Sequence, residues 1–141
     1  MATPTTVQEI MTTSVTTLEP SSRLLDAVLL MRSSGFRHVP VVNDGKLVGI
    51  ISDRDIKRHS PSMLAKISQE EYNKIFEETT IEKVMSKDPI SVLPTAPITE
   101  VVDLMHDRKF GAVPVTDADK ALVGIVTTTD ALGLLRTFLE G

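Results

Sequence analysis

The chain of 141 residues contains no cysteine and no tryptophan, and aromatic residues make up only 4% of it. Without thiols there can be no disulfide framework, no thiolate zinc site and no cysteine nucleophile. No apolar run approaches the roughly 20 residues that a membrane-spanning helix requires. We therefore expect a cytoplasmic protein with no membrane partner.

Positive side chains are also fewer than negative ones, since the chain has 15 Lys and Arg residues and 19 Asp and Glu residues, for a net charge of −4. Binding to a nucleic-acid backbone depends on clustered Lys and Arg, so we expect no nucleic-acid partner. The zinc-protease pattern, the serine-hydrolase elbow and the nucleotide-binding P-loop pattern are all missing from the sequence. We accordingly expect no catalytic residue, no metal site and no required cofactor.

What the sequence does contain is a duplication. The two copies share an aromatic residue, a Val-Pro-Val run and a Leu-Val-Gly-Ile run at offsets of 74, 74 and 75 residues: Phe36 and Phe110, Val39–Val41 and Val113–Val115, Leu47–Ile50 and Leu122–Ile125. A unit of about 60 residues buries only a limited core alone, so each copy should depend on the other. The pattern predicts copy one over 1–58, a connecting insert with a short helix over 59–80 and copy two over 81–141.

Within each copy the spacing of apolar residues predicts the order β-α-β-β-α and an α/β (α+β) fold of two pseudo-symmetric units packed as an intramolecular pair. The expected strands are 15–18, 38–42 and 47–51 in copy one and 90–93, 112–116 and 122–127 in copy two. Apolar residues at helical spacing predict helices over 24–31 and 98–105, and a last helix should begin near Asp55 or Asp130. The residues 43–46, Asn-Asp-Gly-Lys, are typical of a hairpin turn.

Several residues are candidate helix caps. Thr6 with Glu9 and Thr79 with Glu82 have capping-box spacing before short helical turns. Further candidates are Ser21 or Ser22 as a cap in copy one and Pro97 in the first helical turn of copy two.

The insert is not explained by the repeat. Ser60-Pro61-Ser62 interrupts the chain, and Ser68 with Glu71 is expected to cap a helix that continues through Glu78. Tyr72, Ile75 and Phe76 either pack against the module or mark an interaction surface, and we favour packing.

Two segments of each copy resemble the CBS domain family, and their duplication resembles the tandem pair called a Bateman module. In copy one they are Gly35–Val42 and Leu47–Asp55, and in copy two Phe110–Val115 and Leu122–Asp130. The resemblance covers nearly the whole chain, and the insert is also similar to that of bacterial stand-alone CBS proteins of the acetoin-utilisation type. The resemblance implies a regulatory module that binds an adenine nucleotide or adenosyl ligand (AMP, ADP, ATP or S-adenosylmethionine) between its copies, and that forms a homodimer.

The family pattern also implies two clefts, each combining residues of both copies. The first would contain Val15, Thr16, Phe36, Arg37, His38 and Pro40 with Thr127, Thr129 and Asp130. The second would contain Pro89, Ile90, Phe110, Gly111, Ala112 and Pro114 with Ser52, Arg54 and Asp55.

The two aspartates are central to this hypothesis. A carboxylate offers two oxygens to the vicinal hydroxyls of a ribose, and the preceding hydroxyl groups and helix N-terminus offer donors to phosphate. The alternative is that Asp55 and Asp130 only complement the helix dipole, but the resemblance favours ligand binding. Because Arg37 and His38 belong to the first cleft, whereas the second has Arg54, we expect the first to prefer a phosphorylated ligand.

Other interpretations remain open at this stage. His38 could be a partly solvated strand residue, and Arg37 a surface charge. The methionines at 11, 31, 85 and 105 recur at matching positions and indicate core packing. The main alternative to a ligand sensor is a ligand-independent scaffold for dimerisation or for an unidentified protein target.

Overall fold

The computed structural model describes residues 3–61 and 66–141, so Ser62 of the predicted chain break lies outside the described residues. The chain forms two compact units. The copy-one unit comprises Thr16–Asp44 and Val48–Pro89, and the copy-two unit comprises Met1–Val15, Gly45–Leu47 and Ile90–Gly141. The structure therefore divides the chain differently from the sequence repeat, because the residues that precede each copy's first expected strand belong to the other copy's unit.

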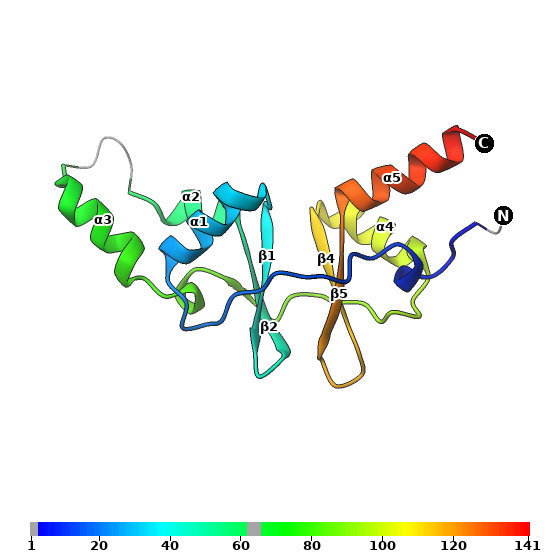
Figure 1. Cartoon of the computed structure of the whole chain (residues 1–141), viewed down its shortest axis with the longest axis horizontal. Helices are drawn as coiled ribbons and strands as arrows, with labels where there is room; N and C mark the ends of the chain where they lie inside the picture. The colour runs from blue at the N-terminus through cyan, green and yellow to red at the C-terminus, as the bar shows by residue number, and fades with distance from the viewer. Residues whose placement is uncertain (1–2, 62–65) are drawn as a thin grey trace. The chain divides into compact units, whose positions relative to one another are not determined.

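The copy-one unit contains a three-stranded sheet in the order β1-β2-β3, with α1 and α2 beside the β1–β2 hairpin (Figure 1). Its elements are α1 (Leu24–Ser34), β1 (His38–Asn43), β2 (Lys46–Ser52, which begins in residues of the copy-two unit), α2 (Asp53–His59), α3 (Gln69–Glu78), the 3-10 helix η2 (Ile81–Lys83) and β3 (Ser86–Lys87). The turn between β1 and β2 has positive φ at Asp44 (52°) and Gly45 (79°), as a two-residue hairpin turn requires.

The copy-two unit repeats this arrangement with an antiparallel β4–β5 pair and α4 and α5 beside it (Figure 1). Its elements are the 3-10 helix η1 (Val7–Glu9), α4 (Ile98–Arg108), β4 (Ala112–Thr116), β5 (Leu122–Thr127) and α5 (Thr128–Leu139). The β-α-β-β-α prediction is thus confirmed for the helices and for both hairpins. The last helices begin at Asp53 and Thr128, two residues before the expected Asp55 and Asp130.

The first strand expected in each copy is reduced to a single bridge. Leu18 pairs with Val41 through hydrogen bonds from Leu18 N to Pro40 O (3.0 Å) and from Val42 N to Leu18 O (2.9 Å). Val92 pairs with Val115 in the same way. Proline has no N–H to donate, so Pro40 cannot extend the ladder beyond this bridge. The prediction of short strands over 15–18 and 90–93 was wrong for this reason, since Pro114 holds in copy two the position of Pro40.

Three of the predicted caps were also wrong. The N-cap of α1 is Arg23, whose N–H donates to Asp26 Oδ2 at 2.8 Å, whereas Ser22 Oγ accepts from Glu19 N. Thr80 rather than Thr79 precedes η2, and Pro97 is the N-cap of α4 rather than part of its first turn. Local hydrogen bonds of this kind compete closely, so cap positions commonly move by one or two residues.

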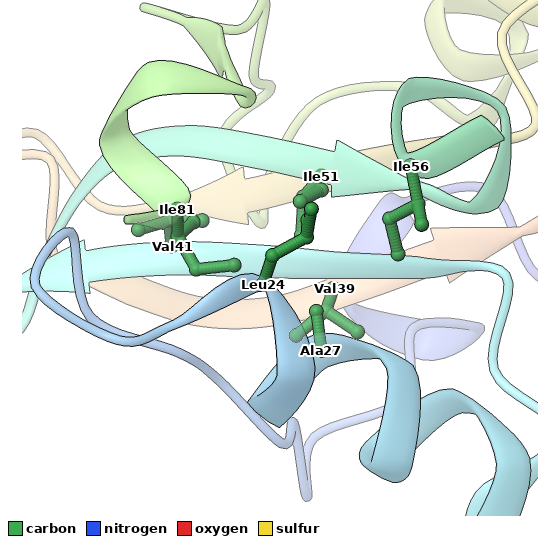
Figure 2. Packing of buried hydrophobic residues seen from close by; sticks show 7 residues of the cluster. All are labelled: Leu24, Ala27, Val39, Val41, Ile51, Ile56 and Ile81. Atoms are coloured by element: carbon green, nitrogen blue, oxygen red, sulfur yellow. The ribbon is translucent and has the colours of Figure 1, made fainter. Parts of the chain in front are cut away.

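Each unit has a hydrophobic core, and each core includes one residue from the segment that precedes the first expected strand of the other copy: Ile81 in the copy-one unit and Val7 in the copy-two unit. In the copy-one unit, the side chains of α1, β1, β2, α2 and η2 converge, as Figure 2 shows: Leu24, Ala27, Val39, Val41, Ile51, Ile56 and Ile81. In the copy-two unit the corresponding cluster is Val7, Val92, Val101, Val113, Val115 and Val126. The methionines at 11, 31, 85 and 105 pack against these two clusters, as predicted.

Matching backbone hydrogen bonds hold the segments around Ile81 and Val7 in their units. Ile81 N donates to Ser22 O at 2.8 Å, and Val7 N donates to Ala96 O at 2.9 Å. Ile81 and Val7 are both fully buried and occupy equivalent places in the repeat. Each unit is therefore completed by residues that precede the first expected strand of the other copy, and this reciprocal exchange produces the same contacts in both units.

Helix α3 of the insert begins at the predicted cap, because Ser68 Oγ accepts from Glu71 N at 3.1 Å. Phe76 packs against the copy-one core, which confirms the packing interpretation for this residue. The Tyr72 ring lies 5.1 Å from that of Phe76, centroid to centroid, but Tyr72 is more than a third exposed. Among the described residues, none of the helices has the length and apolar character needed to cross a bilayer.

Candidate ligand-binding site

Asp55 forms a reciprocal capping box with Ser52 at the start of α2. Its Oδ2 atom accepts from Ser52 N at 2.8 Å and from Ser52 Oγ at 3.0 Å, while Ser52 Oγ accepts from Asp55 N at 3.2 Å. These bonds hold the half-buried carboxylate at the point where β2 ends. Among the described residues they use only one of its two oxygens, which leaves Oδ1 for a further donor.

Asp130 forms the same box with Thr127 at the start of α5. Its Oδ2 atom accepts from Thr127 N at 2.9 Å and from Thr127 Oγ1 at 3.2 Å. A further hydroxyl is close by, because Thr12 Oγ1 lies 3.3 Å from Asp130 Oδ1. Sequence reasoning missed Thr12, which the antiparallel bridge between Thr12 and Ile125 places near this carboxylate. The repeat offers Ser86 as its counterpart, but nothing in the sequence indicated a polar role for either residue.

Within each unit, the start of the hairpin adjoins the start of the following helix. Asp53 N donates to Arg37 O at 3.0 Å, and Thr128 N donates to Gly111 O at 3.1 Å. In the copy-one unit these bonds bring the segment Phe36–His38 next to the capping box of Asp55. The copy-two unit brings Phe110–Ala112 next to that of Asp130 in the same way. Arg37 and the Asp55 capping box therefore lie at one end of the copy-one hairpin, and Gly111 and the Asp130 capping box lie at the equivalent end of the copy-two hairpin.

His38 lies among charged groups at this end of the copy-one unit. Burial lowers its pKa from the ordinary value of 6.5, and this effect outweighs the carboxylates of Asp53 and Asp55, which raise the pKa. The pKa is lowered further by the positive charges of Arg54 and Arg37. A neutral imidazole can both donate and accept a hydrogen bond, so near neutral pH this ring is suited to a polar ligand.

The predicted cleft residues are distributed over both units. The copy-one unit supplies Thr16, Phe36, Arg37, His38, Pro40, Ser52, Arg54, Asp55 and Pro89. The copy-two unit supplies Val15, Ile90, Phe110, Gly111, Ala112, Pro114, Thr127, Thr129 and Asp130. Each predicted cleft takes residues from both sets, and this grouping stays a prediction.

The chemistry of these residues suits a hydroxylated ligand. Each unit offers a carboxylate and a hydroxyl side chain at the start of a helix, with a proline-containing strand beside them. No cluster of three or more His, Asp or Glu side chains with metal-binding geometry occurs in the described parts of the chain. The arrangement can bind polar groups through hydrogen bonds, and it holds two copies of the same donor and acceptor set.

A duplicated β-α-β-β-α unit with a capping aspartate after each hairpin defines the class of protein. The family model of the CBS domain matches residues 7–62 and 81–137, which together exceed half of the chain. The chain therefore belongs to the CBS domain family and contains two CBS domains.

Among curated relatives, the CBS domain-containing protein DDB_G0289609 of Dictyostelium discoideum is 30% identical over 135 residues, which cover 95% of this chain and 93% of that protein. Three archaeal relatives are longer, and the chain spans only 40–45% of their length. The chain also matches about a quarter of two archaeal proteins named homoserine O-acetyltransferase.

Solved structures share the fold over nearly the whole chain. A putative acetoin utilization protein (AcuB) of Vibrio cholerae is 36% identical, with a TM-score of 0.79 and coverage of 96% of this chain and 93% of that one. CBSX2 of Arabidopsis thaliana, solved in complex with AMP, is 26% identical with a TM-score of 0.78, covering 97% and 98%. The CBS domain pair of protein MJ0100, in complex with 5′-methylthioadenosine and S-adenosyl-L-methionine, is 28% identical with a TM-score of 0.77, covering 95% and 98%.

Proposed function

We propose that this protein is a regulatory module without catalytic activity, which binds an adenine nucleotide or an adenosyl ligand through Asp55 and Asp130. The observation that carries the proposal is that the two carboxylates have the same local geometry, each within its own unit. Each stands at the end of a hairpin, is fixed in direction by a capping box and is half-buried next to a hydroxyl side chain. The complexes of CBSX2 with AMP and of MJ0100 with S-adenosyl-L-methionine support an adenosyl ligand.

The role of each group follows from its chemistry. A ribose diol would donate to the aspartate, and hydrogen bonds to a charged acceptor contribute about 1.5–3 kcal/mol each. Ser52 and Thr127 hold the carboxylates in place while their hydroxyls remain near the ligand. Arg37 and His38 in the proposed first cleft, and Arg54 in the second, would bind phosphate. The first cleft is therefore proposed to favour phosphorylated ligands.

A ligand regulates only if it binds one arrangement of the protein more tightly than another. We propose that adenosyl binding between the two domains changes their relative arrangement within a homodimer, and that this change is read by a partner protein. The alternative scaffold function has one observation in its favour: Tyr72 on α3 is more than a third exposed although Phe76 beside it is packed.

Isothermal calorimetry with AMP, ADP, ATP and S-adenosylmethionine tests the proposal. The wild-type chain should bind at least one of them at millimolar concentration or below. Asp55→Asn and Asp130→Asn keep an oxygen acceptor for the capping bond but lose the charge, so each should weaken binding at its own site by about tenfold or more. Absence of binding by all four ligands would overturn the sensor function, and Tyr72→Ala would then be examined for loss of protein association.

A further inference from the structure

His38, the first residue of β1, belongs to a group of five ionisable residues at one end of the copy-one hairpin. The other four precede β1 or begin α2: Arg37, Asp53, Arg54 and Asp55. The hydrogen bond from Asp53 N to Arg37 O at 3.0 Å brings the two segments together, and the capping box at the start of α2 fixes the Asp55 carboxylate. All five residues lie in the copy-one unit, and we call them the copy-one charged cluster.

The net charge of this cluster depends on the protonation state of His38. Two arginines and two aspartates cancel, so the cluster is neutral when the imidazole is neutral and carries +1 when it is protonated. Burial lowers the pKa of His38 from its ordinary value of 6.5. Among the neighbours, the carboxylates of Asp53 and Asp55 raise this pKa, and the guanidinium groups of Arg54 and Arg37 lower it. Without a ligand the ring is therefore mostly neutral at neutral pH.

The imidazole of His38 is accessible to a ligand. In residues 3–61 and 66–141, the one histidine ring that contacts a carboxylate within 4.0 Å is that of His106, so the half-buried ring of His38 has no such partner. In the same parts of the chain no fully buried side-chain nitrogen or oxygen lacks a hydrogen-bond partner. The ring nitrogens of His38 are therefore in contact with solvent, and a ligand oxygen can replace water there.

The repeat shows that the fold does not require these charges. Four of the five positions are uncharged in copy two, where the counterparts of Arg37, His38, Asp53 and Arg54 are Gly111, Ala112, Thr128 and Thr129. The fifth position, Asp55, is matched by Asp130, which forms the same capping box. Copy two forms the same hairpin and helix without the other four ionisable groups, so a structural role does not account for them.

We propose that His38 is a specificity-determining residue that favours phosphorylated over non-phosphorylated adenosyl ligands, and that does so more strongly as the pH falls. The inference rests on the proposed function and adds the proton as a second signal that the module reads. A phosphate beside the ring stabilises its protonated form, so ligand binding and proton uptake favour each other. Copy two has Ala112 at the equivalent position, so the coupling is a property of the copy-one unit alone.

The first test is calorimetry with AMP and with adenosine at pH 8.0 and pH 6.0. The ratio of the AMP affinity of the wild-type chain to that of His38→Gln should rise by about threefold or more between the two pH values, as a charge-assisted hydrogen bond allows. This ratio cancels the ionisation of AMP itself, whose phosphate has a second pKa of about 6. Adenosine has no phosphate, so its ratio should not change.

His106→Gln is the matched control. It removes an imidazole that is 81% exposed on α4 of the copy-two unit and lies 2.9 Å from Asp107. This variant should keep the pH dependence of the wild-type chain.

The second test is NMR of the wild-type chain, which needs no substitution. The chain has three histidines, so few imidazole signals have to be assigned. Saturating AMP should raise the pKa of His38 above its value in the free chain, and saturating adenosine should not.

Three outcomes would overturn the inference while the adenosyl function stands, because AMP still binds in each of them. They are the same pH dependence of AMP binding in His38→Gln as in the wild type, an equal change of pH dependence in His106→Gln, and a His38 pKa that AMP leaves unchanged. If neither AMP nor adenosine binds at either pH, the proposed function itself is refuted and the inference fails with it.

Discussion

Gly124 tests whether residues 6–12 form part of the copy-two unit. A Cβ atom added to Gly124 would lie 2.6 Å from Met11 Sδ, 3.0 Å from Met11 Cγ and 3.1 Å from the backbone oxygen of Thr12. The thioether of Met11 can move, but the Thr12 backbone is held by two hydrogen bonds with Ile125, from Thr12 N to Ile125 O at 2.8 Å and from Ile125 N to Thr12 O at 3.0 Å. Relief of the clash therefore requires the segment to shift or the bridge to break.

Overpacking of this kind costs about 1–3 kcal/mol, and we expect Gly124→Ala to lower the free energy of unfolding by that amount. The measurement is urea denaturation followed by circular dichroism, with the two units fitted separately if their transitions do not coincide. Gly133→Ala is the matched control, because a Cβ at Gly133 meets nothing within 4 Å and Gly133 lies inside α5. That variant should gain up to about 1 kcal/mol from helix propensity.

A Met11→Ala background separates the cost of the clash with the Met11 side chain from the cost of the clash with the Thr12 backbone. In a Met11→Ala background the added Cβ meets only the Thr12 oxygen, so Gly124→Ala should cost less there than in the wild-type chain. If Gly124→Ala is as stable as the wild type in both backgrounds, residues 6–12 do not pack on β5 and the exchange of segments between the copies is refuted. An equal loss in both backgrounds would assign the cost to the Thr12 backbone rather than to Met11.

Three other predictions concern stability. Ile81→Ala should lower the free energy of unfolding by about 2–5 kcal/mol because Ile81 is fully buried in the copy-one core. Ile90 is 40% exposed, so Ile90→Ala should change the free energy of unfolding far less. Equal effects of the two substitutions in urea denaturation would contradict the described core. Ser68→Ala removes the cap of α3 and should cost about 1 kcal/mol by the same assay, and no loss of helical signal or stability would show that Ser68 is not the N-cap. Burial lowers the pKa of His38 below 6.5, so the unfolded chain binds more protons at this residue than the folded chain does. The stabilising contribution of neutral His38 is therefore present above pH 6.5 and is lost as the pH falls. Thermal melts between pH 7.5 and 5.5 should show a smaller decrease in melting temperature for His38→Gln than for the wild type.

The sequence predicts most of the architecture because the repeat presents each pattern twice. The hairpins were located by β-branched runs around a turn whose residues Asp44 and Gly45 adopt positive φ. The segment exchange could not be predicted, because an apolar Val7 or Ile81 indicates burial but does not say against which copy. The first strands failed as predictions because propensity favours extended backbone there, while the ladder depends on the N–H that Pro40 lacks.

The candidate site was predicted less completely than the fold. Asp55 and Asp130 were identified through their place after each hairpin, and the structure adds the capping boxes that orient them. Thr12 was missed because it lies 118 positions before Asp130 in the sequence, and a bridge between Thr12 and Ile125 places the two side chains close together.

The central claim, that the two aspartates bind an adenosyl ligand, is tested most directly by a crystal structure of the chain grown with AMP and S-adenosylmethionine. The account predicts density for an adenosyl group whose ribose hydroxyls donate to Asp55 or Asp130. Density for the ligand away from both carboxylates, or the absence of ligand density at millimolar concentrations, would contradict it.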